Sequence, residues 1–417
     1  MQALGQPIFG RMCSHKMSHK IKSFVALILC SLVATSACAT SITVPPEPKL
    51  KLPAGFHITI FAKLNVAPRM MAFDKNGNLF VSSAKNNQII MLPDANKDGL
   101  AETAVLVSDK LNAPNGLVFL GDDLLVANQD GIVKLTHNEN KWSAPKPFIS
   151  NLPSGGHTLK TIKIGPDNHL YLNVGSSCNV CVEGEPLRAT ILRYTLDGKP
   201  SGGLETLGRH APNPTWAMGL RNSQGFAWHP ITRSMFATNN GADMRSNKKN
   251  GKVNDEFPPE HFNKIEPGKH YGWPHCWANP NDLNKMMQDP NFVGADNFCK
   301  TTTPPAITFT SHSTPIGVTF LDKTNWPAEY KDDAIVALHG SWNREHLSGY
   351  KLVRVKFNGD IPVKVLDFAT GWLNNNKPNN NQGWGRPVDV ITGPDGAMYV
   401  SDDRTGTIYR ISYKSTP

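Results

Sequence analysis

A pattern of two short apolar segments joined by a polar turn recurs along the chain. The clearest copies read MAFDKNGNLFVSS, IKIGPDNHLYLNVG and DVITGPDGAMYVSD. The copies begin at Met71, Gly116, Ile162, Gly225, Gly317 and Asp389. Alternating apolar and polar residues around a turn of Asp, Asn, Gly or Pro are typical of an antiparallel hairpin. Most copies are followed by a third apolar segment, such as QIIML or TIYRISY, so each unit predicts three or four strands.

Such a repeat predicts an all-β fold, a six-bladed β-propeller of four-stranded antiparallel blades. Each unit alone leaves a face uncovered, whereas units stacked radially cover one another. The uneven later spacing places long loops between Gly241 and Pro305. The strand-like segment 56–63 precedes the first copy, and we expect it to pair with the last blade and close the ring. A two-layer sandwich is the competing architecture, and the six-fold recurrence argues against it.

The composition agrees with a folded, turn-rich protein. Hydrophobic residues make up 39% of the 417 residues and charged residues 18%, and the 32 Pro and 34 Gly favour turns over long helices. Residues 1–39 stand apart, because basic residues precede the apolar run FVALILCSLVA and small residues follow it. That order is typical of a secretory or lipoprotein signal segment. Removing its four basic residues from the net charge of +9 leaves +5, which gives no reason to expect a nucleic-acid partner.

Two ways of processing this segment agree with the sequence. ACA at 37–39 fits the small-x-small pattern of signal peptidase, and TSAC at 35–38 approximates a lipoprotein box that lipidates Cys38. Either route leads across the inner membrane, so we expect a periplasmic or secreted protein, free or lipid-anchored at Cys38. We expect a linker at 40–52 and one propeller domain at 53–417.

Four cysteines follow the signal segment, and an even number is typical of an oxidising compartment. We expect two disulfides, Cys178–Cys181 and Cys276–Cys299. CNVC is not followed by histidine, which excludes a c-type haem attachment site. No second CxxC or nearby pair of histidines completes a zinc site, which favours a disulfide over a metal centre.

The residues just before each inner strand are candidates for a ligand site, because these loops crowd around one end of a propeller channel. The candidates are Asn115, His157, Arg221, Asn222 and Arg386, with Arg344 after the fifth hairpin. Arginines that converge on one cavity repel one another unless an anion joins them, so they predict an acidic, planar ligand. We expect Arg69 to form an ion pair between blades instead.

Several of these motifs together resemble one known family. GGHT, LRNSQGFAW, YGWP, HGSWNR and GRPVDVITGPDGAMYVSDD occur in the order typical of the glucose/sorbosone dehydrogenase family. The resemblance extends from about Pro53 to Tyr413, and HGSWNR brings the chain closer to the sorbosone dehydrogenase branch. It implies a secreted six-bladed propeller that uses pyrroloquinoline quinone (PQQ) and calcium.

The resemblance implies roles at the reacting centre. His157 matches the general base that takes the proton of the sugar hydroxyl while hydride passes to the quinone. Arg221 and Asn222 match the pair that holds the quinone oxygens and the charge that develops on them. Asn115 occupies the position of a polar side chain near that centre.

The resemblance also implies how the cofactors are held. Arg344 and Arg386 match cations that face the cofactor carboxylates, and the loop NNGAD supplies calcium ligands through the carbonyls of Gly241 and Ala242. On the substrate side, the family's pattern aligns with Asp255, Glu256, Tyr271 and Trp273. This loop is longer than in the glucose enzymes and carries added lysines and Cys276, which leaves the identity of the sugar open.

A second metal motif is DANKDGLAE. Asp94, Asn96, Asp98 and Glu102 follow the alternate spacing of a calcium loop, with Gly99 at the bend. Val105 stands where an EF-hand has its bidentate acid, so this is no EF-hand. A calcium clip between blades and a plain polar turn remain equal alternatives.

The hypothesis that joins these observations is a PQQ-dependent oxidoreductase that oxidises an aldose or a sugar aldehyde and passes electrons to a periplasmic acceptor. A calcium-dependent propeller lactonase or hydrolase is one alternative, but it needs acidic metal ligands where this sequence places basic residues. A non-catalytic propeller that binds a glycan or a protein partner is the other alternative. It has no need of His157.

Overall fold

The structure is a computed structural model that describes residues 40–41, 49–138, 141–202, 214–373 and 383–414. The chain divides into two units, Met1–Cys38 and Ala39–Pro417, and the described residues all belong to the second. The signal segment expected at 1–39, with Cys38 and both cleavage points, lies outside the described residues. None of the helices in the described ranges is both long enough and apolar enough to cross a lipid bilayer.

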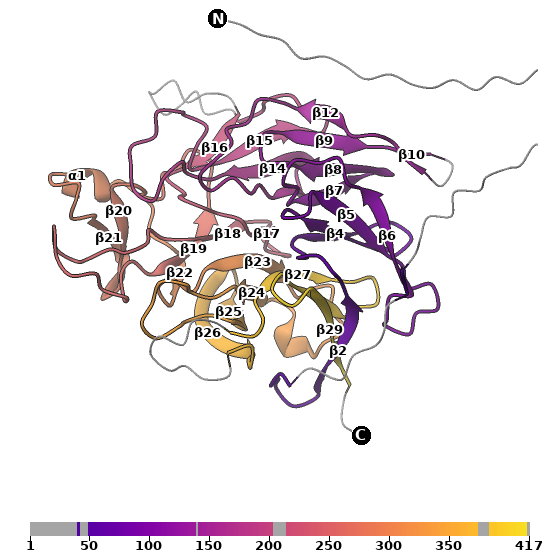
Figure 1. Cartoon of the computed structure of the whole chain (residues 1–417). Helices are drawn as coiled ribbons and strands as arrows, with labels where there is room; N and C mark the ends of the chain where they lie inside the picture. The colour runs from indigo at the N-terminus through magenta and orange to yellow at the C-terminus, as the bar shows by residue number, and fades with distance from the viewer. Residues whose placement is uncertain (1–39, 42–48, 139–140, 203–213, 374–382, 415–417) are drawn as a thin grey trace, which may run out of the picture. The chain divides into compact units, whose positions relative to one another are not determined.

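Six antiparallel sheets surround a common centre and confirm the predicted six-bladed propeller (Figure 1). The first blade holds β3 (Met71–Phe73), β4 (Leu79–Ser83), β5 (Gln88–Leu92) and β6 (Thr103–Ser108). The second holds β7 (Leu117–Leu120), β8 (Asp123–Ala127), β9 (Ile132–Leu135) and β12 (Lys146–Ile149). The third holds β13 (Ile162–Ile164), β14 (His169–Val174), β15 (Thr190–Thr195) and β16 (Thr215–Met218).

The later blades carry the longer loops that the uneven repeat spacing predicts. The fourth holds β17 (Phe226–Trp228), β18 (Met235–Asn239), β19 (Glu260–Ile265) and β22 (Ile307–Phe309). The fifth holds β23 (Pro315–Phe320), β24 (Ala334–Leu338), β25 (Lys351–Asn358) and β26 (Ile361–Ala369). The sixth holds β27 (Pro387–Thr392), β28 (Met398–Asp402), β29 (Thr407–Tyr413) and β2 (Phe56–Lys63). Two small hairpins and two short helical turns complete the elements: β10 (His137–Asn138) with β11 (Lys141–Trp142), β20 (Cys276–Asn279) with β21 (Asp282–Gln288), α1 (Asp296–Cys299) and the 3-10 turn Ala328–Tyr330.

The ring closes through the N-terminal strand, as predicted. β2 pairs antiparallel with β29, from Phe56 opposite Tyr413 to Lys63 opposite Thr407. The last blade therefore takes its outermost strand from the start of the domain, and the edge of β29 is paired with it. Part of the segment expected to be a linker is also paired. β1 (Thr40–Ser41) extends the first blade beyond β6, and Lys51 forms a β-bridge with Thr370.

The apolar core lies between neighbouring blades. Leu125 of the second blade and Leu172 of the third belong to one fully buried cluster, which shows how the alternating apolar positions are used. At the channel, the inner strands approach so closely that side chains are excluded. A Cβ at Gly225 would lie 1.7 Å from the carbonyl oxygen of Ile316, so glycine is required where the fourth blade meets the fifth.

The repeat also determines where a site can form. In each hairpin, the residues before the first strand and after the second strand lie at the same end of the blade. Those segments from all blades therefore meet at one end of the channel.

Candidate active site

His157 lies in the loop that leads into β13, directly after two glycines. Gly156 has a φ of +62°, and a Cβ there would lie 2.5 Å from the carbonyl oxygen of Ser176. Glycine therefore lets this loop pack against the segment after β14, where the amide of His157 donates to that oxygen at 2.9 Å. The local sequence thus fixes the imidazole next to Ser176.

Lys160 anchors the same loop from within the core. Its side chain is fully buried, and Nζ donates to the carbonyl oxygens of Gln129, Pro153 and Thr158. Burial lowers the pKa of Lys160 to about 8, because the ammonium group loses water and gains only neutral carbonyl partners. The lysine ties the loop of His157 to the second blade.

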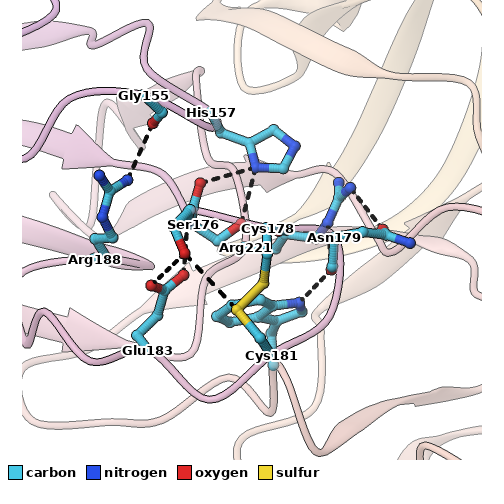
Figure 2. The surroundings of a disulfide bond; sticks show 11 residues. Gly155, His157, Ser176, Cys178, Asn179, Cys181, Glu183, Arg188 and Arg221 are labelled. Carbon is cyan, nitrogen blue, oxygen red and sulfur yellow. Dashed lines mark hydrogen bonds between the residues drawn. A yellow bond between two sulfur atoms is a disulfide. The ribbon is translucent and has the colours of Figure 1, made fainter.

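The hydrogen bonds of His157 define its tautomer (Figure 2). Nδ1 lies 2.8 Å from Ser176 Oγ and 3.2 Å from the carbonyl oxygen of Ser176, which can only accept. The hydroxyl of Ser176 donates its own hydrogen to Cys178 O at 2.7 Å. Nδ1 therefore carries the hydrogen, and Nε2 carries the lone pair. Within the described residues, no group forms a hydrogen bond with Nε2.

The electrostatics keep this ring neutral. Burial, followed by the positive charge of Arg221, lowers the pKa of His157 to about 4. At neutral pH the ring is therefore an imidazole with a free lone pair at Nε2, which is the form that can accept a proton.

Arg221 follows β16 and is buried, with 3% of its surface exposed. Each of its five N–H groups has an acceptor. Nε and Nη2 donate to the backbone and side-chain oxygens of Asn179, Nη2 also donates to Asp243 at 2.8 Å, and Nη1 donates to the carbonyls of Asn240 and Gly241. The guanidinium is thus held by the third and fourth blades together.

Asp243 joins this group to the fifth blade. Its second carboxylate oxygen accepts a hydrogen bond from Asn343 at 3.0 Å. Behind it, the buried carboxylate of Glu260 accepts from the amide of Gly241, and burial raises the pKa of Glu260 to about 7. The loop that was predicted to bind calcium is therefore fixed by an arginine and a buried acid.

Arg344 holds the neighbouring loop in place. It donates to the carbonyl oxygens of Asp255 and Ser311 and forms an ion pair with Glu256. The carboxylate of Asp255 accepts from the amide of Glu345 at 2.8 Å. Arg344 and Asp255 therefore lie at this end of the propeller, where their contacts join the loops of the fourth and fifth blades.

A second polar network surrounds Arg69, where the inner ends of the blades meet at the channel. Arg69 donates to Asn115 at 3.0 Å, to Gln224 at 3.0 Å and to Asp403 at 2.7 Å, and His339 contacts the same carboxylate at 2.9 Å. It joins five blades, and it confirms the predicted inter-blade ion pair of Arg69. Asn115 is fully buried, with its amide also donating to Lys160 O, so the structure gives it a supporting position and no exposed surface for a ligand.

The charges of this network are balanced by burial and pairing. Burial alone would raise the pKa of Asp403, but His339 and Arg69 hold that pKa well below its usual range. Burial lowers the pKa of His339 to about 4. Asn222, which is 6% exposed, contacts both networks. Gln224 of the Arg69 network donates to its side chain at 3.5 Å, and the amide of Asn240, beside Arg221, donates to its carbonyl oxygen at 3.0 Å.

Arg386 differs from the other arginines. Its Nε and Nη2 donate to the backbone oxygens of His339 and Gly340, and its guanidinium lies over the ring of Tyr350 at 5.6 Å. Within the described residues, no carboxylate forms an ion pair with it. The expected cationic group of arginines is therefore largely neutralised by Asp243, Glu256 and Asp403, whereas Arg386 has no direct ion-pair partner among the described residues.

Two residues that were expected on the substrate side are buried in the structure. Tyr271 is 1% exposed, and its hydroxyl donates to Lys264 O and accepts from the amide of Glu266. This side chain packs in the core between the third and fourth blades. Trp273 is 7% exposed, and its indole N–H donates to Asn179 O at 3.1 Å, so it supports the loop around Arg221.

The carbonyls of Gly241 and Ala242 lie beside Arg221, as the position of NNGAD implies. The Gly241 oxygen accepts from the guanidinium at 2.7 Å, whereas the Ala242 oxygen accepts no hydrogen bond from the described residues. Both residues line a narrow cavity of about 20 Å³ together with Arg221 and Trp273. That volume holds about one water molecule.

The loop 94–102 is held together by its own polar groups. Asp94 accepts from the amides of Asp98 and Gly99, Asn96 accepts from the amide of Asp98, and Glu102 accepts from the amide of Asn96. This is the geometry of a polar turn, and a calcium clip remains a prediction. Across the described ranges, one group of three metal-binding side chains has its ligand atoms together: Cys178, Cys181 and Glu183.

Those two cysteines form a disulfide, as do Cys276 and Cys299, so both predicted pairings are confirmed. A disulfide has no thiolate to offer a metal, which favours a structural role for CNVC.

Sequence reasoning missed the acidic and amide partners of the site. Two positions in the sequence could have indicated the acids. Asp243 lies in the motif NNGAD, and Asp403 directly follows the last inner hairpin. Asn179 lies between the two cysteines of CNVC, and nothing in the sequence indicates that it contacts Arg221.

Comparisons with known proteins agree with this architecture. A family model described as TrAA12-like matches residues 50–414. The pyrroloquinoline quinone-dependent pyranose dehydrogenase of Coprinopsis cinerea is 25% identical over 420 residues, which cover 89% of this chain and 56% of that enzyme. The chain thus spans little more than half the length of that relative.

Two solved structures share the fold. The holo form of the pyranose dehydrogenase PQQ domain from Coprinopsis cinerea superposes with a TM-score of 0.73 at 21% identity, covering 88% of this chain and 98% of that domain. The calcium structure of the Trichoderma reesei carbohydrate-active enzyme of family AA12 has a TM-score of 0.74 at 20% identity, covering 90% and 99%. At these identities the likeness shows the fold alone.

Proposed function

Because the chain belongs to the TrAA12-like family, we propose that it is a sugar oxidoreductase with PQQ and calcium as cofactors. The substrate class that we propose is an aldose or a sugar aldehyde, and the electrons pass to a periplasmic acceptor. The observation that carries the proposal is the state of His157, whose Nδ1–H is bound to Ser176, whose Nε2 forms no hydrogen bond among the described residues, and whose ring is kept neutral by burial and by Arg221.

The donor set fits PQQ in its charge. PQQ is a planar quinone with three carboxylates, and this end of the channel offers guanidinium and amide groups on several blades. Arg386 and Asn222 would hold it, because Arg386 has no carboxylate partner among the described residues. Arg344 would contribute after releasing Glu256, whose side chain is 66% exposed and is free to turn into solvent. Arg221 acts mainly through its field, since its donors are occupied.

The oxygen ligands also fit calcium. Carbonyl and carboxylate oxygens are the ligands that Ca²⁺ prefers, and the loop after β18 offers both types at Gly241, Ala242 and Asp243. A cation at the Gly241 carbonyl would lie next to Arg221. The carboxylate of Asp243 would then face two cationic groups, Ca²⁺ and the Arg221 guanidinium, which makes Asp243 the acid that this arrangement requires.

The protein's own residues would then manage the proton of the reaction. When bound, PQQ supplies the two-electron acceptor for the hydride of the sugar carbon. Nε2 of His157 accepts the hydroxyl proton, and Ser176 keeps the ring oriented through Nδ1–H. Burial and the charge of Arg221 disfavour the imidazolium that results, so the proton is released to solvent at neutral pH.

The two alternatives lack this support. A hydrolase of the calcium-dependent type needs several free carboxylates at the channel, whereas Asp243 and Asp403 are engaged by arginines here. A non-catalytic binding propeller does not require a histidine that is held in one tautomer, as His157 is. We further propose a periplasmic or secreted location, free or lipid-anchored at Cys38, and the two disulfides support an oxidising compartment.

A titration with PQQ in the presence of calcium, followed by absorbance, tests the redox class first. The loaded protein is then mixed with aldoses and sugar aldehydes and an artificial dye. We expect dye reduction, which His157→Ala abolishes without loss of cofactor binding, whereas the exposed His137→Ala has no effect. No dye reduction with any sugar in a cofactor-loaded sample would refute the proposal.

A further inference from the structure

The disulfide Cys178–Cys181 closes a four-residue loop whose contacts converge on the candidate active site (Figure 2). Asn179 lies within this loop, and its backbone oxygen, Oδ1 and Nδ2 all form hydrogen bonds. Its backbone oxygen accepts from Arg221 Nε at 3.0 Å and from Trp273 at 3.1 Å. Its side-chain oxygen accepts from Arg221 Nη2 at 2.9 Å and from the amide of Asp243 at 2.7 Å, and its Nδ2 donates to Asp243 O at 2.9 Å.

This density of contacts is unusual for an exposed residue. Asn179 is exposed, so it fills no core and its contacts cannot be explained by packing. All of its partners belong to other segments of the chain, on the loops before β17, after β18 and after β19. An exposed asparagine loses conformational freedom when it makes five directed hydrogen bonds. The disulfide limits that cost, because it restricts the loop backbone before the contacts form.

The same loop also reaches His157. The hydroxyl of Ser176 donates to the carbonyl oxygen of Cys178, which leaves its lone pairs for Nδ1–H of the imidazole. If the Cys178 carbonyl moved away, the hydroxyl could turn and donate to Nδ1, which favours the opposite tautomer. The loop 178–181 therefore reaches His157 through Ser176, and it contacts the Arg221 guanidinium through Asn179.

We propose that Asn179, held in the disulfide-closed loop 178–181, is a positioning residue that fixes Arg221 and Asp243 relative to His157. The catalytic importance of this role rests on the proposed function. The fixing of Arg221 and Asp243 by Asn179 does not, because it involves only residues of this chain. The guanidinium of Arg221 has three hydrogen bonds to other groups, and those acceptors all lie after β18, on the fourth blade. Asn179 is the contact that ties the guanidinium to the third blade, where His157 lies.

The first test is made without cofactor. The imidazole titration of His157 is followed by NMR in the wild type and in Asn179→Ala, and its signal among the 14 histidines is assigned with His157→Gln. Arg221 is one of the causes that lower the pKa of His157. When the guanidinium is released from the third blade, its field at the ring weakens, so the midpoint moves up toward the ordinary value of 6.5. The matched control is Asn325→Ala, an exposed asparagine that donates to Asp395 O and leaves the midpoint unchanged.

The second test uses the loaded enzyme. Asn179→Ala lowers kcat by about tenfold or more and leaves KM for the sugar nearly unchanged, because positioning acts on the transition state. Asn179→Asp keeps the acceptors for Arg221 and for the amide of Asp243, so it recovers part of this loss. Cys178→Ser combined with Cys181→Ser frees the backbone oxygen of Asn179 and shifts the pH profile in the same direction as Asn179→Ala.

The outcomes separate this inference from the proposed function. A His157 midpoint and a kcat that stay at the wild-type values in both Asn179→Ala and the double serine variant would overturn the positioning role. An inactive wild type with every sugar would refute the proposed function, while the NMR comparison would still decide whether Asn179 fixes Arg221. Equal losses in thermal stability for Asn179→Ala and Asn325→Ala, with no shift of the midpoint, would also count against positioning.

Discussion

Nη1 of Arg69 lies 2.7 Å from Oδ2 of Asp403, and this ion pair joins the first blade to the last one. The two side chains are 11% and 16% exposed, and His339 contacts the second oxygen of the same carboxylate. The pair therefore closes the ring at the channel, as β2 closes it at the rim. A buried charge that loses its partner is costly, which makes this contact a sensitive test of the fold.

Asp403→Asn should destabilise the protein by about 3 kcal/mol, because Arg69 then remains buried without a compensating charge. The folded-state pKa of Asp403 is depressed, so its contribution is present above the unfolded pKa and is lost as pH falls through the folded one. Denaturant unfolding at neutral pH measures the loss. Asp122→Asn, in an exposed pair with Lys75, should change stability by less than about 1 kcal/mol. Equal effects of the two substitutions would show that the channel pair is not special.

The pH dependence of sugar oxidation should follow His157. Because burial and Arg221 lower its pKa to about 4, the base is unprotonated over the whole neutral range. We expect kcat/KM to be constant as pH falls from neutral and to decline only as pH passes through about 4. The profile is measured with a dye whose reduction does not itself depend on pH. A decline centred near 6.5 would mean that His157 is solvated and not held as the structure shows.

Tyr271 provides a test of the predicted substrate side. Its hydroxyl is buried between Lys264 O and the amide of Glu266, so Tyr271→Phe leaves those groups without a partner. We expect a loss of about 2 kcal/mol in unfolding free energy and an unchanged KM for the sugar. An unchanged stability with a raised KM would restore Tyr271 to the substrate site. Tyr413→Phe is the control, since no hydrogen bond of its hydroxyl is found among the described residues.

The fold was predictable because its repeat is local. A strand, a polar turn and a second strand are read from fifteen or so neighbouring residues, and six copies leave few architectures. The glycines before the inner strands carry further information, since Gly225 is required where blades meet. The closing strand followed from its position ahead of the first copy, and the disulfides followed from the even number of cysteines.

The ion pairs of the candidate site were not predictable, because they join residues that are far apart in the chain. Arg69 and Asp403 are separated by 334 positions, and sequence alone shows the arginine without the acid that neutralises it. The direction of a side chain in a long loop is equally hidden. Tyr271 and Trp273 stand in such a loop, where no period of two or of 3.6 indicates which side faces the core.

Arg386 should be the arginine that matters most for cofactor affinity. Its guanidinium donates to two backbone oxygens and, among the described residues, to no carboxylate, so no direct ion pair has to break before it attracts an anion. Arg386→Gln should raise the Kd for PQQ by about tenfold or more and reduce the dependence of that Kd on salt. Arg386→Lys keeps the charge but loses the two-pronged geometry, so its Kd should lie between those of the wild type and Arg386→Gln. The exposed Arg233→Gln, on the turn between β17 and β18, provides a charge-matched control with unchanged affinity. The measurement is an absorbance titration at two salt concentrations, with circular dichroism to verify that each variant is folded. If Arg386→Gln binds PQQ as tightly as Arg233→Gln does, the anion is held elsewhere and the assignment of this end of the channel is wrong.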